Sequence, residues 1–217
     1  MKKARDELGG DGDELAEWIK SVRQFVADKL AQGQVALATK GPDLDEQREP
    51  LDTVVIHHTS AAPGYDLNYL NAVHLLNIYT PYFCNPTDER EKDLKGQPIW
   101  SGHFWRERQV FWGYHWLMRM DGSFEHLLSD HQIGWHSGNW EINKRSVGIC
   151  LDNDYNHQDP DAETLAKLGQ FISSHYRGVK PERVFGHCEI KAGTTCPGTN
   201  FVTGWKPRLL GLILKMK

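Results

Sequence analysis

The sequence predicts an α/β protein: a single domain with a central mixed β-sheet flanked by helices, plus an N-terminal helical extension. Three observations lead to this prediction. Short β-branched runs alternate along the chain with amphipathic segments, which is typical of parallel strands joined by helices. An Asp-Gly turn joins two neighbouring strand-like runs, so one antiparallel hairpin belongs to the same sheet. A polar stretch separates the first amphipathic segment from the rest of the chain.

The N-terminal extension is predicted from residues 13–31, where apolar side chains recur at helical spacing behind Asp13 as an N-cap. The polar stretch from Lys40 to Pro50 is typical of a linker. We therefore divide the chain into an extension with its linker, residues 1–44, and a main domain, residues 45–217. We expect the helix to pack against the main domain, and binding to a partner is the alternative.

The main domain begins with a β-branched run, Leu51 to His57, which predicts a buried strand that ends in histidine. Residues 66–79 have the spacing of a helix. Residues 80–112 mix Pro, Asn and charges with many aromatic side chains, and we interpret them as a long insertion. Long loops in compact domains are usually functional, so this insertion is expected to contribute to substrate choice.

The second half of the main domain has the clearest pattern. Two runs, 114–120 and 123–128, flank the turn Met-Asp-Gly-Ser and predict the hairpin. The remaining expected elements are a strand over 146–151, an amphipathic helix over 161–176, a strand over 183–187 and a closing helix over 204–216.

Composition sets limits on function. The 217 residues are 39% hydrophobic and 25% charged, which is ordinary for a globular protein. The net charge of −4 gives no basic face for nucleic acid. No apolar run is long enough for a transmembrane helix, and no secretory signal is visible, so a cytoplasmic location as synthesised is expected. The four cysteines are then expected to be reduced thiols. Oligomeric state is left open.

Two distant fragments indicate a metal site. The first is V-V-I-H-H-T-S, Val54 to Ser60, and the second is G-H-C-E-I-K-A-G-T-T-C-P-G, Gly186 to Gly198. Together they could offer His57 or His58, His187 and Cys196 to one zinc ion. Three protein ligands leave a fourth position for water, which distinguishes a catalytic zinc from a structural one. A metal hydrolase is therefore predicted. Neither the H-E-x-x-H helix of many metalloproteases nor the G-x-S-x-G elbow of serine hydrolases occurs.

Four blocks together carry a family resemblance. They are I-H-H-T, G-Y-H-W-L-M-R-M-D-G, H-S-G-N-W-E-I-N-K-R-S-V-G-I and G-H-C-E-I with T-T-C-P-G. In this order they resemble the zinc N-acetylmuramoyl-L-alanine amidases of type 2, which include phage amidase lysozymes and peptidoglycan recognition proteins. The resemblance spans roughly residues 51 to 217.

The resemblance implies one zinc ion per chain, held by His57, His187 and Cys196. His58 points to the opposite side of the strand, because successive side chains alternate. Cytoplasmic recycling amidases usually have aspartate at the third ligand, so Cys196 favours the lysozyme and recognition-protein branch. Cys188, next to a ligand, is interpreted as a small packed residue.

The resemblance also implies residues that assist catalysis. Tyr114 matches a cleft tyrosine in G-Y-x-[FW], which would stabilise the oxyanion or position the water. Thr194 matches a helper two residues before the cysteine. The loop is one residue longer here than in lysozyme-like members, so Thr195 and Lys191 remain alternatives. Two further positions, His136 and Asn143, match residues of the substrate cleft, although the asparagine mainly orders the loop in many members.

The function implied by the resemblance is zinc-dependent hydrolysis of the amide bond between N-acetylmuramic acid and L-alanine. The expected partner is peptidoglycan or a muropeptide, and release from the cytoplasm would bring the protein to the cell wall. Two alternatives remain open: a peptidoglycan-binding module without activity, and an amidase that acts on soluble muropeptides during recycling.

Overall fold

A computed structural model describes most of the main domain and parts of the segments before it. The described residues are 21, 24–25, 28–29, 31–34, 37–39, 43–64, 103–105, 108–109 and 113–216. The chain divides into two compact units, residues 1–41 with 66–111 and residues 42–65 with 112–217. The second unit contains the sheet and every predicted site residue.

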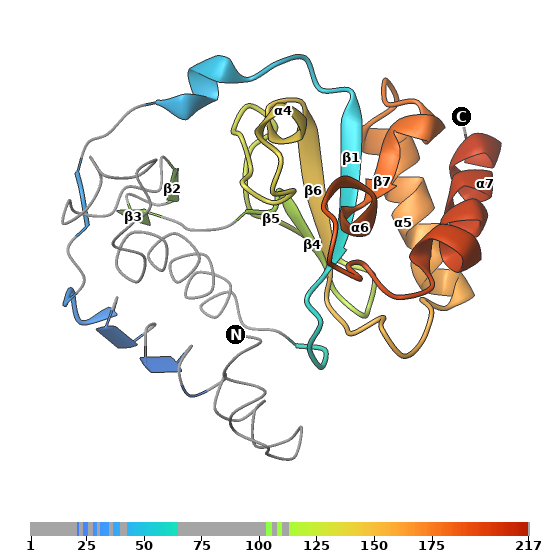
Figure 1. The fold of residues 1–217 in the computed structure, drawn as a ribbon, viewed down its shortest axis with the longest axis horizontal. Helices are drawn as coiled ribbons and strands as arrows, with labels where there is room; N and C mark the ends of the chain where they lie inside the picture. Colours follow the sequence, from blue (N-terminus) through green and yellow to red (C-terminus); the bar gives the residue numbers. More distant parts are fainter. Residues whose placement is uncertain are drawn as a thin grey trace. The chain divides into compact units, whose positions relative to one another are not determined.

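A five-stranded mixed sheet forms the centre of the second unit (Figure 1). Its strands are β1 (Thr53–His58), β4 (Trp116–Met118), β5 (Phe124–His126), β6 (Ser146–Leu151) and β7 (Val184–Gly186). They lie in the order β5-β4-β6-β1-β7. Strand β1 is parallel to both β6 and β7, β4 is parallel to β6, and only β5 runs antiparallel, against β4. The predicted mixed sheet with its hairpin is confirmed.

The two central strands are buried on both faces. All six residues of β1 and all six of β6 are buried, which explains their continuous apolar sequence. Within β1, Val54 and Ile56 belong to the main hydrophobic core, whereas the alternate residues Val55 and His57 do not. The alternation of side chains along a strand therefore sends His57 to the face opposite the main core.

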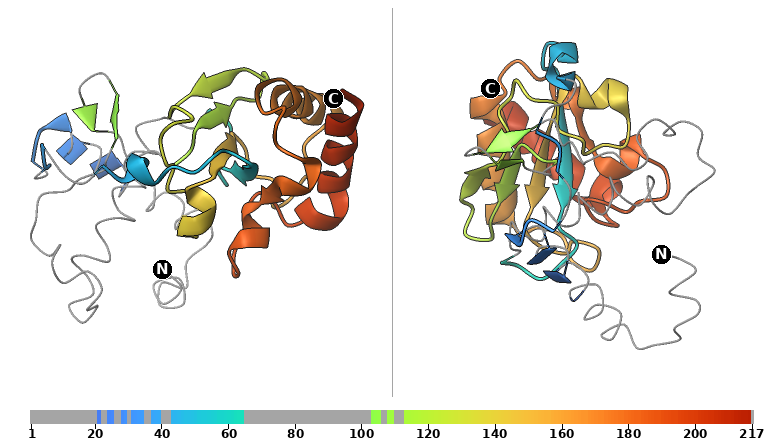
Figure 2. Two further views of the ribbon diagram at one scale, coloured as in Figure 1. Left: turned by 90° about the horizontal axis from the view of Figure 1, so that it is seen from above. Right: turned by 90° about the vertical axis from the view of Figure 1, so that its left-hand side faces the viewer.

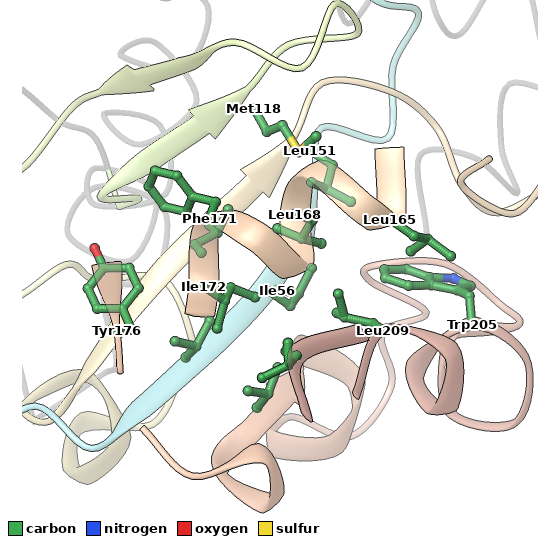
Figure 3. Packing of buried hydrophobic residues seen from close by; sticks show 14 of the residues in the cluster. Ile56, Met118, Leu151, Leu165, Leu168, Phe171, Ile172, Tyr176, Trp205 and Leu209 are labelled. Carbon is green, nitrogen blue, oxygen red and sulfur yellow. The ribbon is translucent and has the colours of Figure 1, made fainter. Parts of the chain in front are cut away.

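Helices α5 (Ala162–His175) and α7 (Lys206–Met216) cover the core face of the sheet and lie side by side (Figure 2). Asp161 caps α5 by accepting a hydrogen bond from the Thr164 N–H at 2.7 Å, as expected for an N-cap. Figure 3 shows Ile56 of β1 grouped with side chains of both helices and with the fully buried Trp205. This packing supports β1, at whose end His57 and His58 lie.

Several short elements were not predicted. They are a 3-10 helix at Leu44–Gln47, α4 (Trp140–Asn143), a 3-10 helix at Pro181–Arg183, α6 (His187–Ile190) and a π-helical turn at Phe201–Trp205. The predicted strand over 183–187 is corrected at its end. Strand β7 stops at Gly186, whose N–H donates to Glu189 Oε2 at 2.9 Å, and His187 opens α6. The acceptor three residues ahead starts a helix there.

The described residues of the first unit bear on two predictions, the N-terminal helix and the long insertion. Six residues of the predicted N-terminal helix are described, and all are helical: Ser21, Gln24, Phe25, Asp28, Lys29 and Ala31. The insertion contains two short antiparallel strands, β2 (Phe104–Trp105) and β3 (Arg108–Gln109). The helix predicted over 66–79 lies outside the described residues. Among the helices that the structure describes, none has the length and apolarity needed to cross a membrane.

Candidate metal centre

Three soft donors meet at one end of the sheet. The ligand atoms of His57, His187 and Cys196 lie within 4.8 Å of one another. They come from the end of β1, the start of α6 and the loop between α6 and α7. The Cys196 sulfur lies 3.7 Å from His57 Nδ1. His57 and His187, which are 130 positions apart in the sequence, are therefore brought close together.

The sheet register explains this meeting. Strands β1 and β7 are parallel neighbours in which Ile56 lies opposite Gly186. The residue after each of these two is a histidine, His57 in β1 and His187 at the start of α6, so both imidazoles emerge at the same end of the sheet. Cys196 is held against them by the main chain, because the Cys188 N–H donates to the Cys196 carbonyl at 2.7 Å. The turn between Cys188 and Cys196 thus places the Cys196 thiol beside the histidines.

The side chain of His58 points away from the donor group. Its Nδ1 accepts a hydrogen bond from the Tyr155 N–H at 3.1 Å, and Tyr155 belongs to the main core. Burial lowers the pKa of His58 to about 4, although Asp154 nearby acts to raise it. His58 is therefore a neutral, packed side chain on the other face of β1.

The protonation states of two donors suit a metal. Burial, with a further contribution from Lys191, lowers the pKa of His187, so its imidazole is neutral at neutral pH. Burial raises the pKa of the Cys196 thiol to about 12. Without a cation that thiol keeps its proton, whereas a metal ion deprotonates a coordinating thiol. The centre therefore gains a negative charge only when a cation is present to balance it.

The donor set fits zinc. Zinc takes imidazole nitrogen at about 2.1 Å and thiolate sulfur at about 2.3 Å, so nitrogen and sulfur in a tetrahedral site lie about 3.6 Å apart. The observed distance between His57 Nδ1 and Cys196 Sγ is 3.7 Å. Imidazole nitrogen and thiolate sulfur are both common ligands of zinc in proteins. The three residues could hold the ion with little rearrangement.

The loop after Trp135 contacts both His57 and His187. His136 Nδ1 lies 2.9 Å from His57 Nε2, and the carbonyl oxygen of Ser137 lies 3.1 Å from His187 Nε2. The loop is itself held by Asn143, whose Oδ1 accepts hydrogen bonds from the Ser137 N–H at 3.0 Å and from its hydroxyl at 2.7 Å. The loop thus contacts Nε2 of each histidine, and in His57 the other nitrogen, Nδ1, faces the thiol.

The predicted cleft residues His136 and Asn143 are both buried, with 7% and 5% of their surfaces exposed. Their predicted role in substrate contact stays a prediction, and the ordering role of Asn143 has a direct structural basis. Ser137 and Ser146, which complete this network, were missed. The Ser137 contact uses a main-chain oxygen, which leaves no signature in a sequence.

Tyr114 lies beside the donor group. Its ring centroid is 4.9 Å from that of His57, with the planes tilted by 48°. The residue is partly exposed and stands just before β4. The Tyr114 ring therefore lies next to one of the three donors, and its role in catalysis stays a prediction.

The three candidate helpers have different surroundings. The Thr194 hydroxyl accepts a hydrogen bond from the Cys196 N–H at 3.2 Å. The Thr195 hydroxyl donates to Asn156 Oδ1 at 2.7 Å, away from the donor group. Lys191 lies across Gly138, where an added Cβ would meet its Cδ at 2.8 Å, and its charge contributes to the lowered pKa of His187.

A comparison with protein families matches residues 47–199 to the N-acetylmuramoyl-L-alanine amidases. The chain belongs to the N-acetylmuramoyl-L-alanine amidase family. The match includes all seven predicted site residues of this family member. Curated proteins offer no sequence match.

Solved structures show the same fold at low sequence identity. An N-acetylmuramoyl-L-alanine amidase, LysC, from Clostridium intestinale is 19% identical, with a TM-score of 0.53 over 84% of this chain and 97% of that chain. The endolysin amidase LysCS from the same organism is 18% identical, with a TM-score of 0.52 over 84% of this chain and 96% of that chain. These likenesses confirm the amidase-like fold of the family member.

Proposed function

We propose that this chain is a zinc-dependent N-acetylmuramoyl-L-alanine amidase. Its reaction would be hydrolysis of the amide bond between the lactyl group of N-acetylmuramic acid and L-alanine of the stem peptide in peptidoglycan. The observation that carries the proposal is the grouping of His57, His187 and Cys196 within 4.8 Å. Three protein ligands leave one position open, as a hydrolytic zinc site requires. Family membership supports the choice of bond.

Each donor would have a distinct part in holding the ion. Zinc, when bound, lowers the pKa of a water molecule towards neutrality and polarises the scissile carbonyl. His57 and His187 would bind it as neutral imidazoles through the nitrogens that face Cys196. Cys196 would bind as a thiolate, losing its proton as the ion enters. One negative charge from the protein would partly balance the dication.

Two hydroxyl groups would assist the reaction. The phenol of Tyr114, on a ring 4.9 Å from His57, would donate a hydrogen bond to the oxygen that gains negative charge, or would position the water. The Thr194 hydroxyl accepts from the Cys196 N–H, which leaves its own proton free to donate towards the same site. We propose Tyr114 and Thr194 as the catalytic helpers, with Lys191 and Thr195 as the alternatives to Thr194.

The experiment is a mass analysis of products from purified peptidoglycan. Incubation with the full chain should release intact stem peptides that begin with L-alanine and leave glycan strands uncut. Removal of the metal with a chelator should stop this release, and added zinc should restore it. Products cut within the glycan or within the stem peptide would contradict the proposed bond specificity.

The same assay separates the alternatives. Sedimentation of the protein with peptidoglycan, without any released peptide, would identify a binding module. Cleavage of soluble muropeptides without attack on whole peptidoglycan would identify a recycling enzyme. The Cys196 ligand and the grouped donors favour the lytic amidase over both.

A further inference from the structure

His136 and His57 form a buried pair of imidazoles behind the metal centre. His57 Nε2 lies 2.9 Å from His136 Nδ1, and the two rings are edge to face, with centroids 5.0 Å apart and planes at 88°. The other nitrogen of His136, Nε2, lies 3.2 Å from the Ser146 hydroxyl oxygen. All three residues are buried. These contacts make one continuous chain from the donor group to the start of β6.

The direction of hydrogen bonding along this chain follows from the position of the thiol. His57 directs Nδ1 to the Cys196 sulfur, 3.7 Å away, so Nδ1 must be the unprotonated nitrogen if it binds a metal. A neutral imidazole then carries its proton on Nε2. That N–H donates to His136 Nδ1, which must in turn be unprotonated. A neutral His136 would then carry its proton on Nε2 and donate it to the Ser146 hydroxyl.

We propose that His136 is a positioning residue of the metal centre, which accepts the His57 Nε2–H and so holds His57 with Nδ1 directed to the zinc ion. The proposal rests on the proposed zinc-dependent function. Partners of this kind orient metal ligands and set their tautomer. His136 would therefore act on the ion through His57.

The residues around His136 pack closely against its ring. Gly148 of β6 lies under the ring, where an added Cβ would come within 2.8 Å of His136 Cγ. The next residue, Ser137, performs the matching task for the second ligand, because its carbonyl oxygen lies 3.1 Å from His187 Nε2. Two adjacent loop residues thus serve one histidine ligand each.

Two substitutions in the full-length chain test the role of His136. His136→Leu removes the acceptor at similar volume, whereas His136→Asn keeps an oxygen near the position of Nδ1. Zinc affinity is measured by competition with a chelator, and folding of each metal-free variant is checked by thermal unfolding. We expect His136→Leu to weaken zinc binding about 10- to 100-fold and His136→Asn to recover most of the loss. A folded His136→Leu variant with zinc affinity within twofold of wild type would overturn the proposal.

A second measurement does not depend on zinc or on any variant. Nitrogen-15 shifts of the His57 ring in the metal-free wild-type chain report which nitrogen carries the proton. The proposal requires the proton on Nε2, and a predominantly Nδ1-protonated ring would overturn it even if His136→Leu fails to fold. Failure of the wild-type chain to bind zinc would instead refute the proposed function, while the tautomer would still decide the pairing of His57 with His136.

Discussion

His57 and His58 are neighbours in the chain with opposite environments. His57 faces a thiol, a second imidazole and a phenol, whereas the ring of His58 is hydrogen-bonded to the main chain of Tyr155 in the core. The alternation of side chains along β1 accounts for the difference. From the sequence, the family resemblance implied His57 as the ligand, and the regular alternation of a strand placed His58 on the opposite side. The partner on the far side of His57 could not be predicted, since it depends on how a loop folds.

Tyr114→Phe tests the proposed hydroxyl donor. The ring contact with His57 remains in this variant, so zinc affinity and stability should stay close to wild type. Loss of one hydrogen bond to the developing charge should lower kcat by about 100-fold or more, with little change in KM. The measurement is steady-state hydrolysis of a soluble muropeptide. An unchanged kcat would assign Tyr114 a packing role.

At the scale of secondary-structure elements, strand β6 and the loop before α4 together hold the residues that contact the two histidine ligands. Gly148 provides room for the His136 ring, and Ser146 on the same strand provides its hydrogen-bond partner. Asn143, at the end of α4, fixes the loop by accepting two hydrogen bonds from Ser137. The supports of both histidine ligands therefore come from one continuous segment, 136–148, which contributes no proposed ligand itself.

Gly148→Ala tests this arrangement without touching a histidine. A Cβ at Gly148 would meet His136 Cγ at 2.8 Å, so the ring must move by several tenths of an ångström. We expect zinc affinity to fall about 10-fold and stability to fall by about 1–3 kcal/mol. Gly211→Ala is the matched control, because an added Cβ at this helical glycine meets no atom within 4 Å. It should leave zinc binding unchanged and raise stability slightly.

A zinc affinity equal to wild type in a folded Gly148→Ala protein would contradict this account of the loop. Chelator competition and urea unfolding measure the two quantities separately. A change in stability alone would show that the glycine serves packing only.

Elements with a strong period were predicted well, and short ones were not. The strand Ser146–Leu151 has the predicted bounds, and the helix Ala162–His175 differs from its prediction by one residue at each end. The strand is a continuous buried run, and the 14-residue helix has apolar residues at helical spacing. Helix α6 has four residues, too few to show a helical period, and its start depends on a side-chain contact from Glu189. Sequence motifs indicated the ligands, whereas the contact to His187 uses the main-chain oxygen of Ser137, which leaves no signature in a sequence.

At the scale of the whole sheet, the two ends of its parallel strands have different roles. The carboxyl ends of β1 and β7 deliver the histidines. The opposite end of β1 is held by Asp52, whose carboxylate binds Arg145 and Arg183, with Arg183 Nη2 3.0 Å from Asp52 Oδ1. This cluster ties the start of β1 to the starts of β6 and β7. Burial tends to raise the pKa of Asp52, but hydrogen bonds from Arg145, Thr53 and Arg183 outweigh it and lower that pKa from 3.8 to about 2.

Asp52→Asn should therefore destabilise the fold in a pH-dependent way. Because the folded pKa lies below the unfolded one, the stabilisation is complete above pH ~4 and is lost as pH falls towards about 2. The carboxylate is 35% exposed, so after screening by solvent we expect a loss of about 1 kcal/mol at neutral pH. Urea unfolding at several pH values measures it. A difference that stays constant down to pH 3 would contradict the assignment, and Glu163→Gln on the exposed side of α5 is the control.

The most direct test of the central claim is a zinc titration of the metal-stripped protein, followed by release of stem peptides from purified peptidoglycan. Release should be negligible without zinc and should reach a plateau at one zinc ion per chain. Cys196→Ser should stay near the baseline at that zinc concentration. Cys188→Ser should follow wild type, because Cys188 supports Cys196 through its main-chain N–H. Full release by the metal-free wild-type protein, or by the Cys196→Ser variant, would contradict a catalytic zinc held by His57, His187 and Cys196.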